Sequence, residues 1–153
     1  MGADEQPGLW SIAWHPGVVA PKGSPHAATG FCWAKDDGVL VSQDGLSWEL
    51  PGGRPEPGES WQQTFVREVF EEACARVLSC TLLGFSRGER QDTAGSASVL
   101  VRAVYRAEVF LESWRPLHET KFRRVVPRRQ VLDHLSASPE VRAVLAHVLR
   151  SFD

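Results

Sequence analysis

The sequence predicts one α/β domain in which a mixed β-sheet lies between helices, an α/β/α sandwich. Three observations support this fold class. Strand-like runs occur on both sides of one central helix, that helix follows a glycine turn, and a second amphipathic helix ends the chain. With 153 residues, 42% hydrophobic and 24% charged, the chain can bury a substantial core. We therefore expect a single domain over residues 1–153, with residues 1–26 as an N-terminal arm.

Four strand-like segments precede the central helix. They combine apolar and β-branched residues and are bounded by turn-forming residues. They are residues 8–14, 27–35, 39–43 and 47–50. The sequence Asp36-Asp37-Gly38 favours a hairpin turn between the second and the third.

The second half of the chain predicts three more strands and two helices. The expected strands are residues 77–85, 97–110 and 122–126, with a polar loop over 86–96. A short helix is expected over 128–134. Residues 139–152 carry apolar side chains at helical spacing, which predicts an amphipathic helix that docks on the sheet.

The central helix has a clear start signal. Ser60 followed by Gln63 is typical of a capping box, so the helix is expected to begin at Trp61. The helical wheel predicts one apolar face that packs on the core. Its members are Val66, Val69, Phe70 and Ala73.

The opposite face of this helix is acidic. Glu68, Glu71 and Glu72 project within an arc of roughly 100°. Like charges at this spacing each cost about 0.2–0.5 kcal/mol, and the C-terminal half of a helix also disfavours anions. Surface helices are often rich in glutamate, but a divalent cation bound to phosphate oxygens would explain this concentration of charge directly.

A glycine turn precedes the acidic helix. In the sequence Leu50-Pro51-Gly52-Gly53, the two glycines allow the backbone to approach a ligand where a Cβ would clash. Such a turn can offer a carbonyl oxygen to a cation. An ordinary surface loop is the alternative, and the adjacent acidic helix favours the binding role.

The turn and the helix together follow a known pattern. From residue 53 to residue 75 the chain resembles the signature of the Nudix (MutT-like) hydrolase family, the Nudix box. The matching positions are Gly53, Glu59, Arg67, Glu68, Val69, Glu71 and Glu72. The chain departs from the pattern at Cys74, where the family has glycine, and at Ala75. We expect Cys74 to change how the helix ends without removing a carboxylate.

The resemblance implies a fold, a reaction class and a cofactor. It implies the Nudix fold with one catalytic helix and a C-terminal helix. It also implies hydrolysis of a nucleoside diphosphate linked to another moiety, with Mg²⁺ or Mn²⁺ bound. Glu68, Glu71 and Glu72 would be metal ligands together with the Gly52 carbonyl, and Glu71 and Glu72 would also serve catalysis.

The resemblance assigns supporting roles as well. Arg67 would orient a glutamate of the box, while Gly53 and Glu59 would be structural. The general base is left open between a box glutamate and Glu119, an acid from a later loop. Glu89 and Asp92 are weaker candidates, and each of these loop acids could instead be solvated.

The substrate is less well defined by the sequence. We expect a nucleoside triphosphate pyrophosphatase of the housecleaning type. The alternatives are a hydrolase of nucleotide sugars or dinucleotides such as ADP-ribose, a non-catalytic nucleotide-sensing module, and an isomerase of isoprenoid diphosphates. Arg54, Arg87 and Arg90 stand in loops from which they could reach substrate phosphates.

Charge and cysteine content exclude some other classes. A formal net charge of −2 gives no general attraction for nucleic-acid polymers or anionic membranes, so we expect a small nucleotide as substrate. The three cysteines lack paired metal-ligand spacing and are expected to be reduced thiols. The N-terminus resembles no targeting segment, which predicts a cytoplasmic protein, and a homodimer is left open.

Overall fold

The computed structural model describes residues 10–91 and 94–152 of the chain. Its centre is a 7-stranded sheet with the order β1-β5-β6-β2-β3-β7, and β4 pairs with β2 beside this path. The strands are β1 (Trp10–Pro16), β2 (Ser24–Ala34), β3 (Asp37–Ser42), β4 (Gly52–Gly53), β5 (Ala75–Gln91), β6 (Ala97–Leu111) and β7 (Phe122–Pro127). The β2–β6 pair is parallel and the other pairs are antiparallel, so the sheet is mixed as predicted.

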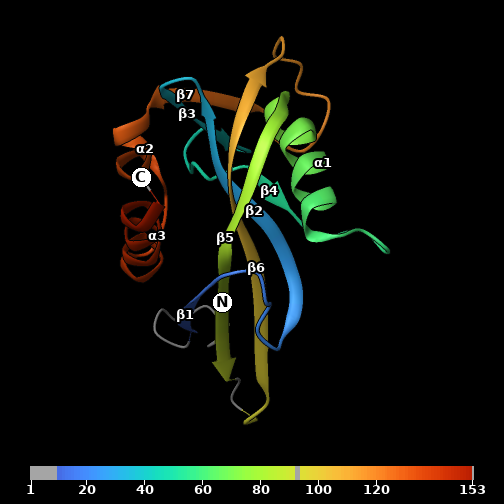
Figure 1. Ribbon diagram of the computed structural model, residues 1–153, viewed down its shortest axis with the longest axis vertical. Coiled ribbons are helices and arrows are strands. Elements are labelled where there is room, and N and C mark those ends of the chain that lie inside the picture. The colour runs from blue at the N-terminus through green and yellow to red at the C-terminus, as the bar shows by residue number, and fades with distance from the viewer. Residues whose placement is uncertain (1–9, 92–93, 153) are drawn as a thin grey trace.

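Helices cover both faces of this sheet (Figure 1). Helix α1 (Trp61–Ala73) lies on one side, and α2 (Val131–His134) and α3 (Pro139–Phe152) lie on the other. Each face has its own buried cluster. Phe65 and Tyr105 stack in the cluster under α1, with ring centroids 4.8 Å apart, and Trp33 and Val148 belong to the cluster under α3. The predicted α/β/α sandwich is confirmed.

Helix α1 begins where the sequence predicts, but it faces the sheet differently. Both hydrogen bonds of the Ser60–Gln63 capping box are present. Phe65, Val69 and Ala73 are fully buried, whereas Val66 and Phe70 are 38% and 57% exposed, so the expectation that these two pack on the core is wrong. The spacing of Phe65, Val69 and Ala73 rotates the helix relative to the predicted face.

Strand boundaries differ from prediction in two places. Ala34 pairs with Asp37, so the hairpin turn is Lys35-Asp36 and Lys35 takes a positive φ of 57°. The expected strand over 47–50 contributes only a bridge between Val41 and Glu49.

The second half of the chain departs from prediction in two further places. Strand β5 continues to Gln91, because residues expected in a polar loop pair with β1 on one side and β6 on the other. The helix expected over 128–134 divides into a 3₁₀ helix, Arg128–Gln130, and α2. The predicted C-terminal helix over 139–152 is confirmed.

The helices within residues 10–91 and 94–152 are too short or too polar to cross a lipid bilayer. The cytoplasmic location and the homodimer remain predictions.

Candidate functional site

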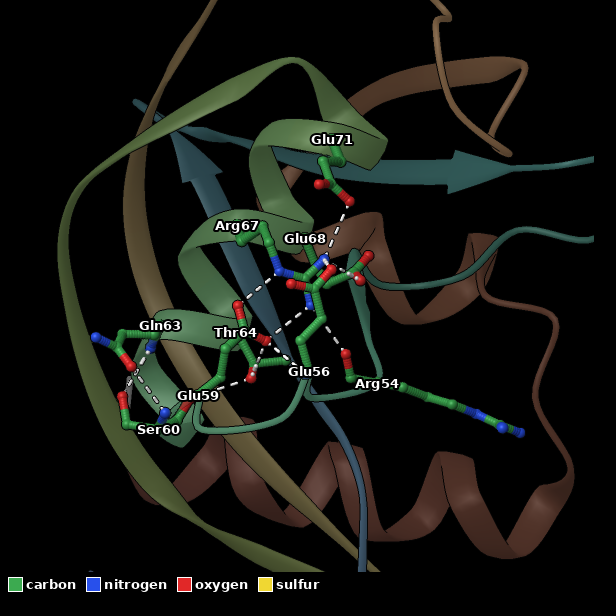
Figure 2. Close-up of polar contacts among 9 residues, drawn as sticks. All are labelled: Arg54, Glu56, Glu59, Ser60, Gln63, Thr64, Arg67, Glu68 and Glu71. Atoms are coloured by element: carbon green, nitrogen blue, oxygen red, sulfur yellow. Dashed lines mark hydrogen bonds and ion pairs between the residues drawn. The ribbon is translucent and has the colours of Figure 1, made fainter.

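Arg67 lies at the centre of a group of carboxylates that we call the Arg67 network: Glu59, Arg67, Glu68 and Glu71. Its guanidinium donates to Glu59 at 2.7 and 2.9 Å, to Glu68 at 2.8 Å and to Glu71 at 3.1 Å. It also donates to the Arg54 carbonyl at 3.0 Å, which ties the helix to the preceding loop. Figure 2 shows the guanidinium among the carboxylates, while the Arg54 side chain extends away from them. One cation therefore neutralises three anions of the site in part.

The Arg67 network alters the acidity of its members. The hydrogen bond from Arg67 lowers the pKa of Glu59 to about 2, and the Glu56 amide supports this at 2.7 Å. The same contact with Glu59 raises the pKa of Arg67. Thr64 is fully buried and donates to Glu59 at 3.0 Å, which fixes the carboxylate from a third side. The loop and the first turns of α1 thus form one rigid unit.

Glu72 lies on the other side of the site, against the glycine turn. It accepts a hydrogen bond from the Gly52 amide at 2.8 Å. A Cβ at Gly53 would lie 2.4 Å from Cδ of Glu68, and a Cβ at Gly52 would lie 2.4 Å from the Ala28 carbonyl oxygen. A Cβ at Gly52 would clash with the backbone of β2, whereas a Cβ at Gly53 would displace the Glu68 carboxylate from its place against the turn.

Glu72 has no cation to balance its charge among the groups that act on it. Burial raises its pKa to about 7, and the negative charges of Glu68, Glu49 and Glu119 act in the same direction. Burial also raises the pKa of Glu68, in spite of its contact with Arg67. The charge of Glu119 acts on both Glu68 and Glu72, which places this acid of the 112–121 loop beside the acidic helix.

The C-terminal end of α1 keeps the conformation that glycine would favour. Cys74 is left-handed, with φ 50° and ψ 46°, and its amide bonds the Phe70 carbonyl at 3.1 Å. Thr120 donates to the Glu72 carbonyl at 2.6 Å, and Arg123 donates to the Ala73 carbonyl at 2.9 Å. The expectation that Cys74 changes how the helix ends is therefore wrong, because cysteine takes the left-handed conformation itself. The hydrogen bond of Thr120 brings the neighbouring Glu119 to this helix end.

A cavity of about 500 Å³ opens beside the glycine turn. Its walls come from β1, β2, β5, β6, the 48–54 segment and the 135–145 segment, and Gly52, Gly53 and Arg54 form one border. Most of the wall under α3 is apolar, and Trp14 and Trp48 contribute aromatic surface. Volume and lining are those of a small-molecule site.

The structure brings some of the expected phosphate-binding residues to this cavity and not others. Arg54 borders it. Arg87 instead donates to the Lys22 carbonyl at 2.9 Å and pairs with Glu89 at 3.2 Å, and Arg90 lies over the Trp10 ring. Arg87, Glu89 and Arg90 lie outside the cavity lining, so their roles remain predictions. Asp92 lies outside the described residues.

Sequence reasoning missed three ionisable residues of the cavity, His26, Glu49 and Arg102. Arg102 had a usable signal, because it interrupts the apolar run 99–105 of a predicted strand at a position that shares a face with Val104. His26 and Glu49 gave no such signal, since both stand near turn-forming residues.

Within residues 10–91 and 94–152, no group of three or more His, Cys, Asp or Glu side chains converges closely enough to hold a metal ion in this arrangement. Arg67 engages Glu68 and Glu71, and Glu72 bonds the backbone. The donor set nevertheless suits a hard cation, since it offers only carboxylate and carbonyl oxygens. Burial, followed by the charges of neighbouring glutamates, raises the pKa values of Glu68 and Glu72, so their ionised forms are disfavoured without a cation.

The α/β/α fold, with an acidic helix packed against a glycine turn, is the arrangement of a Nudix domain. The sequence matches the NUDIX domain over residues 24–148, which is most of the chain. The chain belongs to the Nudix family, and the resemblance to MutT-like hydrolases is confirmed.

Two curated relatives share parts of the sequence. YtkD of Bacillus subtilis (strain 168), provisionally named an 8-oxo-dGTP diphosphatase, is 34% identical over 84 residues, 54% of this chain and 50% of that protein. An 8-oxo-dGTP diphosphatase of Proteus vulgaris is 38% identical over 64 residues, 38% of this chain and 57% of that protein. The matched segments thus span about half the length of each relative.

The fold is also found in solved structures. The pyrophosphohydrolase BsRppH of Bacillus subtilis superposes with a TM-score of 0.72 at 25% sequence identity. The alignment covers 91% of this chain and 87% of that one. The Nudix fold therefore extends over nearly the whole chain.

Proposed function

We propose that the chain is a metal-dependent pyrophosphohydrolase that cleaves nucleoside triphosphates to nucleoside monophosphates and pyrophosphate. One observation carries this proposal: Glu68 and Glu72 face the Gly52-Gly53 turn at the border of a cavity large enough for a nucleotide. The site thus combines surplus negative charge, a backbone turn open to close approach, and an adjoining apolar cavity.

Glu68, Glu71 and Glu72, with the Gly52 carbonyl, would hold Mg²⁺ or Mn²⁺. A bound divalent ion would neutralise phosphate charge and lower the pKa of a water molecule. Arg67 would serve this site indirectly, because its hydrogen bonds to Glu68 and Glu71 orient both carboxylates. Glu59 and Thr64 would in turn fix the guanidinium and the loop.

We assign proton abstraction from the attacking water to Glu119. Its charge acts on Glu68 and Glu72, so it lies near the expected reaction centre. It is exposed at the surface of its loop and keeps access to solvent, which a base needs to pass its proton on. Water would attack one phosphorus, a phosphoanhydride bond would break, and the product phosphates would leave as anions.

The cavity and the relatives support a nucleoside triphosphate as substrate. The base would lie between the sheet and the apolar wall under α3, and Arg54 would meet the phosphates at the border with the turn. The two relatives named as 8-oxo-dGTP diphosphatases support a triphosphate and a housecleaning role.

A substrate panel tests this proposal. Purified protein would be incubated with Mg²⁺ or Mn²⁺ and with canonical and oxidised nucleoside triphosphates, ADP-ribose and nucleotide sugars, and the products would be identified. We expect triphosphates to give monophosphate and pyrophosphate. Glu119→Gln should lower kcat about 100-fold, while the control Glu112→Gln, another loop carboxylate, should not. Absence of turnover on every compound would favour a nucleotide-sensing module.

A further inference from the structure

The cavity beside the glycine turn is electrostatically uneven. Under α3 its wall is apolar, with Val141, Val144 and Leu145. His26, Arg54 and Arg102 line the same cavity. The charges of Arg102 and Arg54 both act on His26, so the cavity contains a group of basic side chains as well as an apolar wall that suits a nucleobase.

The sheet register places Arg102 near the glycine turn. In the parallel pair β2–β6, Arg102 stands opposite Ala27, and the next residue of β2, Ala28, stands opposite Gly53 in β4. Arg102 and Gly53 are therefore about two strand spacings apart, roughly 10 Å between Cα atoms. A chain of phosphates that starts at the turn can extend to the guanidinium.

The arginines near the site differ in whether protein oxygens hold their guanidinium groups. Arg67 and Arg123 each donate to several oxygens. Within residues 10–91 and 94–152, the side chains of Arg102 and Arg54 make no hydrogen bond or ion pair. The Arg102 side chain is exposed, partial burial lowers its pKa, and the charge of Glu49 acts in the opposite direction. A guanidinium with five donors in a cavity and no protein acceptor suits an acceptor on a ligand.

The neighbouring basic groups make an anion the most fitting ligand. Burial lowers the pKa of His26, and the charges of Arg102 and Arg54 lower it further. The three side chains therefore lie close enough to disfavour one another's positive charge. An anion between them would relieve this repulsion, and a phosphate also offers the paired oxygens that match a guanidinium.

We propose that Arg102, with His26 and Arg54, forms a subsite for a substrate phosphate beyond those bound at the acidic helix. The subsite makes the cavity selective for nucleotides with three phosphates over monophosphates and over nucleotide sugars. The identity of this phosphate as part of a nucleotide substrate rests on the proposed function. The subsite itself rests on the position and the missing acceptor of Arg102.

Binding without divalent metal tests the subsite independently of turnover. Titration calorimetry in EDTA would compare dGMP, dGDP and dGTP on the unchanged chain, Arg102→Gln, Arg102→Lys and the control Arg76→Gln, which removes an arginine from the exposed part of β5. We expect Arg102→Gln to weaken dGTP about tenfold or more and dGMP less than about twofold, since a charged hydrogen bond is lost. Arg102→Lys should fall between, and Arg76→Gln should match the unchanged chain.

Three results would overturn the proposal: no measurable binding of dGTP by the unchanged chain, no effect of Arg102→Gln, or equal weakening of dGMP and dGTP. The last would place the nucleoside, not a phosphate, at Arg102. Circular dichroism would confirm that each variant folds.

With Mg²⁺ present, Arg102→Gln should raise KM for dGTP about tenfold while kcat changes less than about threefold. Arg102-dependent binding without turnover would refute the hydrolase proposal alone, and turnover indifferent to Arg102 would refute the subsite alone.

Discussion

The two sides of the acidic site contain the same kind of residue in opposite electrostatic situations. In the Arg67 network, one guanidinium contacts Glu59, Glu68 and Glu71, and the pKa of Glu59 falls to about 2. Glu72 lies one turn along the same helix from Glu68. Within the described part of the chain its side chain accepts a hydrogen bond from the Gly52 amide alone, and its pKa rises to about 7. These four glutamates lie within 14 residues and have the same side chain. Their different environments therefore come from the groups that each one contacts.

This difference separates structure from proposed function. The Arg67 network resembles an ordinary stabilising ion-pair cluster, since each charge has a partner. Glu72 violates that rule, because a partly buried carboxylate beside Glu68, Glu49 and Glu119 disfavours the folded state when ionised. Such a group does not favour folding, and this supports the proposal that Glu72 binds a cation.

Glu72→Gln should have the largest effect on function. We expect turnover with Mg²⁺ to fall about 1,000-fold, because a metal ligand at the reaction centre is lost. The same substitution should raise the melting temperature of metal-free protein at pH 8, because it removes a repelled charge. Steady-state kinetics and thermal unfolding with and without Mg²⁺ measure both effects.

The control for that experiment is Glu112→Gln, which removes a carboxylate that is 43% exposed and pairs only with Arg76 at 3.7 Å. It should leave turnover and metal-dependent stabilisation nearly unchanged. Unaltered activity in Glu72→Gln would refute its assignment as a metal ligand.

Substitution of Arg67 should act in the opposite direction on stability. Arg67→Gln leaves Glu59, Glu68 and Glu71 without their shared cation, so metal-free protein should melt at a lower temperature. Activity should fall about 10- to 100-fold, because the ligands lose their orientation. Arg67→Lys keeps the charge but not the planar fork, and it should recover only part of both losses. If Arg67→Gln melted no earlier than the unchanged chain, the network would have no stabilising role.

The sequence was sufficient to predict those parts of the site that are formed by residues close together in the chain. Helical spacing placed three glutamates on one face, and Ser60 and Gln63 located the helix start. The motif indicated that Arg67 orients a glutamate of the box, and it contacts Glu68 and Glu71. It was also sufficient for the fold class, because strand and helix patterns are local. These features depend on residues close together in the chain.

Features that depend on distant segments were less predictable. The burial of Val66 and Phe70 was mispredicted because the rotation of α1 depends on Phe65 packing against Tyr105 of β6, 40 residues away. The length of β5 depends on its pairing with both β1 and β6. Arg102 and His26 meet at one cavity only because β2 and β6 lie parallel in the sheet.

The Arg67 network and Glu72 should affect the pH dependence of stability with opposite signs. The pKa of Glu59 is lowered, so its contribution is present above its unfolded pKa of 4.5 and is lost as pH falls toward about 2. The pKa of Glu72 is raised, so its penalty develops as pH rises from 4.5 through about 7 in metal-free protein. Denaturant unfolding from pH 2.5 to 8 should show Glu59→Gln flattening the acid limb and Glu72→Gln the neutral limb. If both variants flattened the same limb, the contrast between the two sides would be wrong.

The smallest effect is expected at the end of the acidic helix, where Cys74 holds a left-handed conformation that favours glycine. Cys74→Gly should raise the free energy of unfolding by about 1 kcal/mol, since strain in this region costs about 1–3 kcal/mol and glycine loses more backbone freedom on folding. Loss of the Sγ hydrogen bond to the Arg115 carbonyl, at 3.2 Å, offsets part of this gain. For a domain of this size the shift is about 2–4 °C in Tm. Cys74→Ala, which keeps a Cβ and also lacks Sγ, should be less stable than Cys74→Gly. The opposite order would show that the backbone strain relieved by glycine at this position is smaller than the backbone freedom that glycine loses on folding.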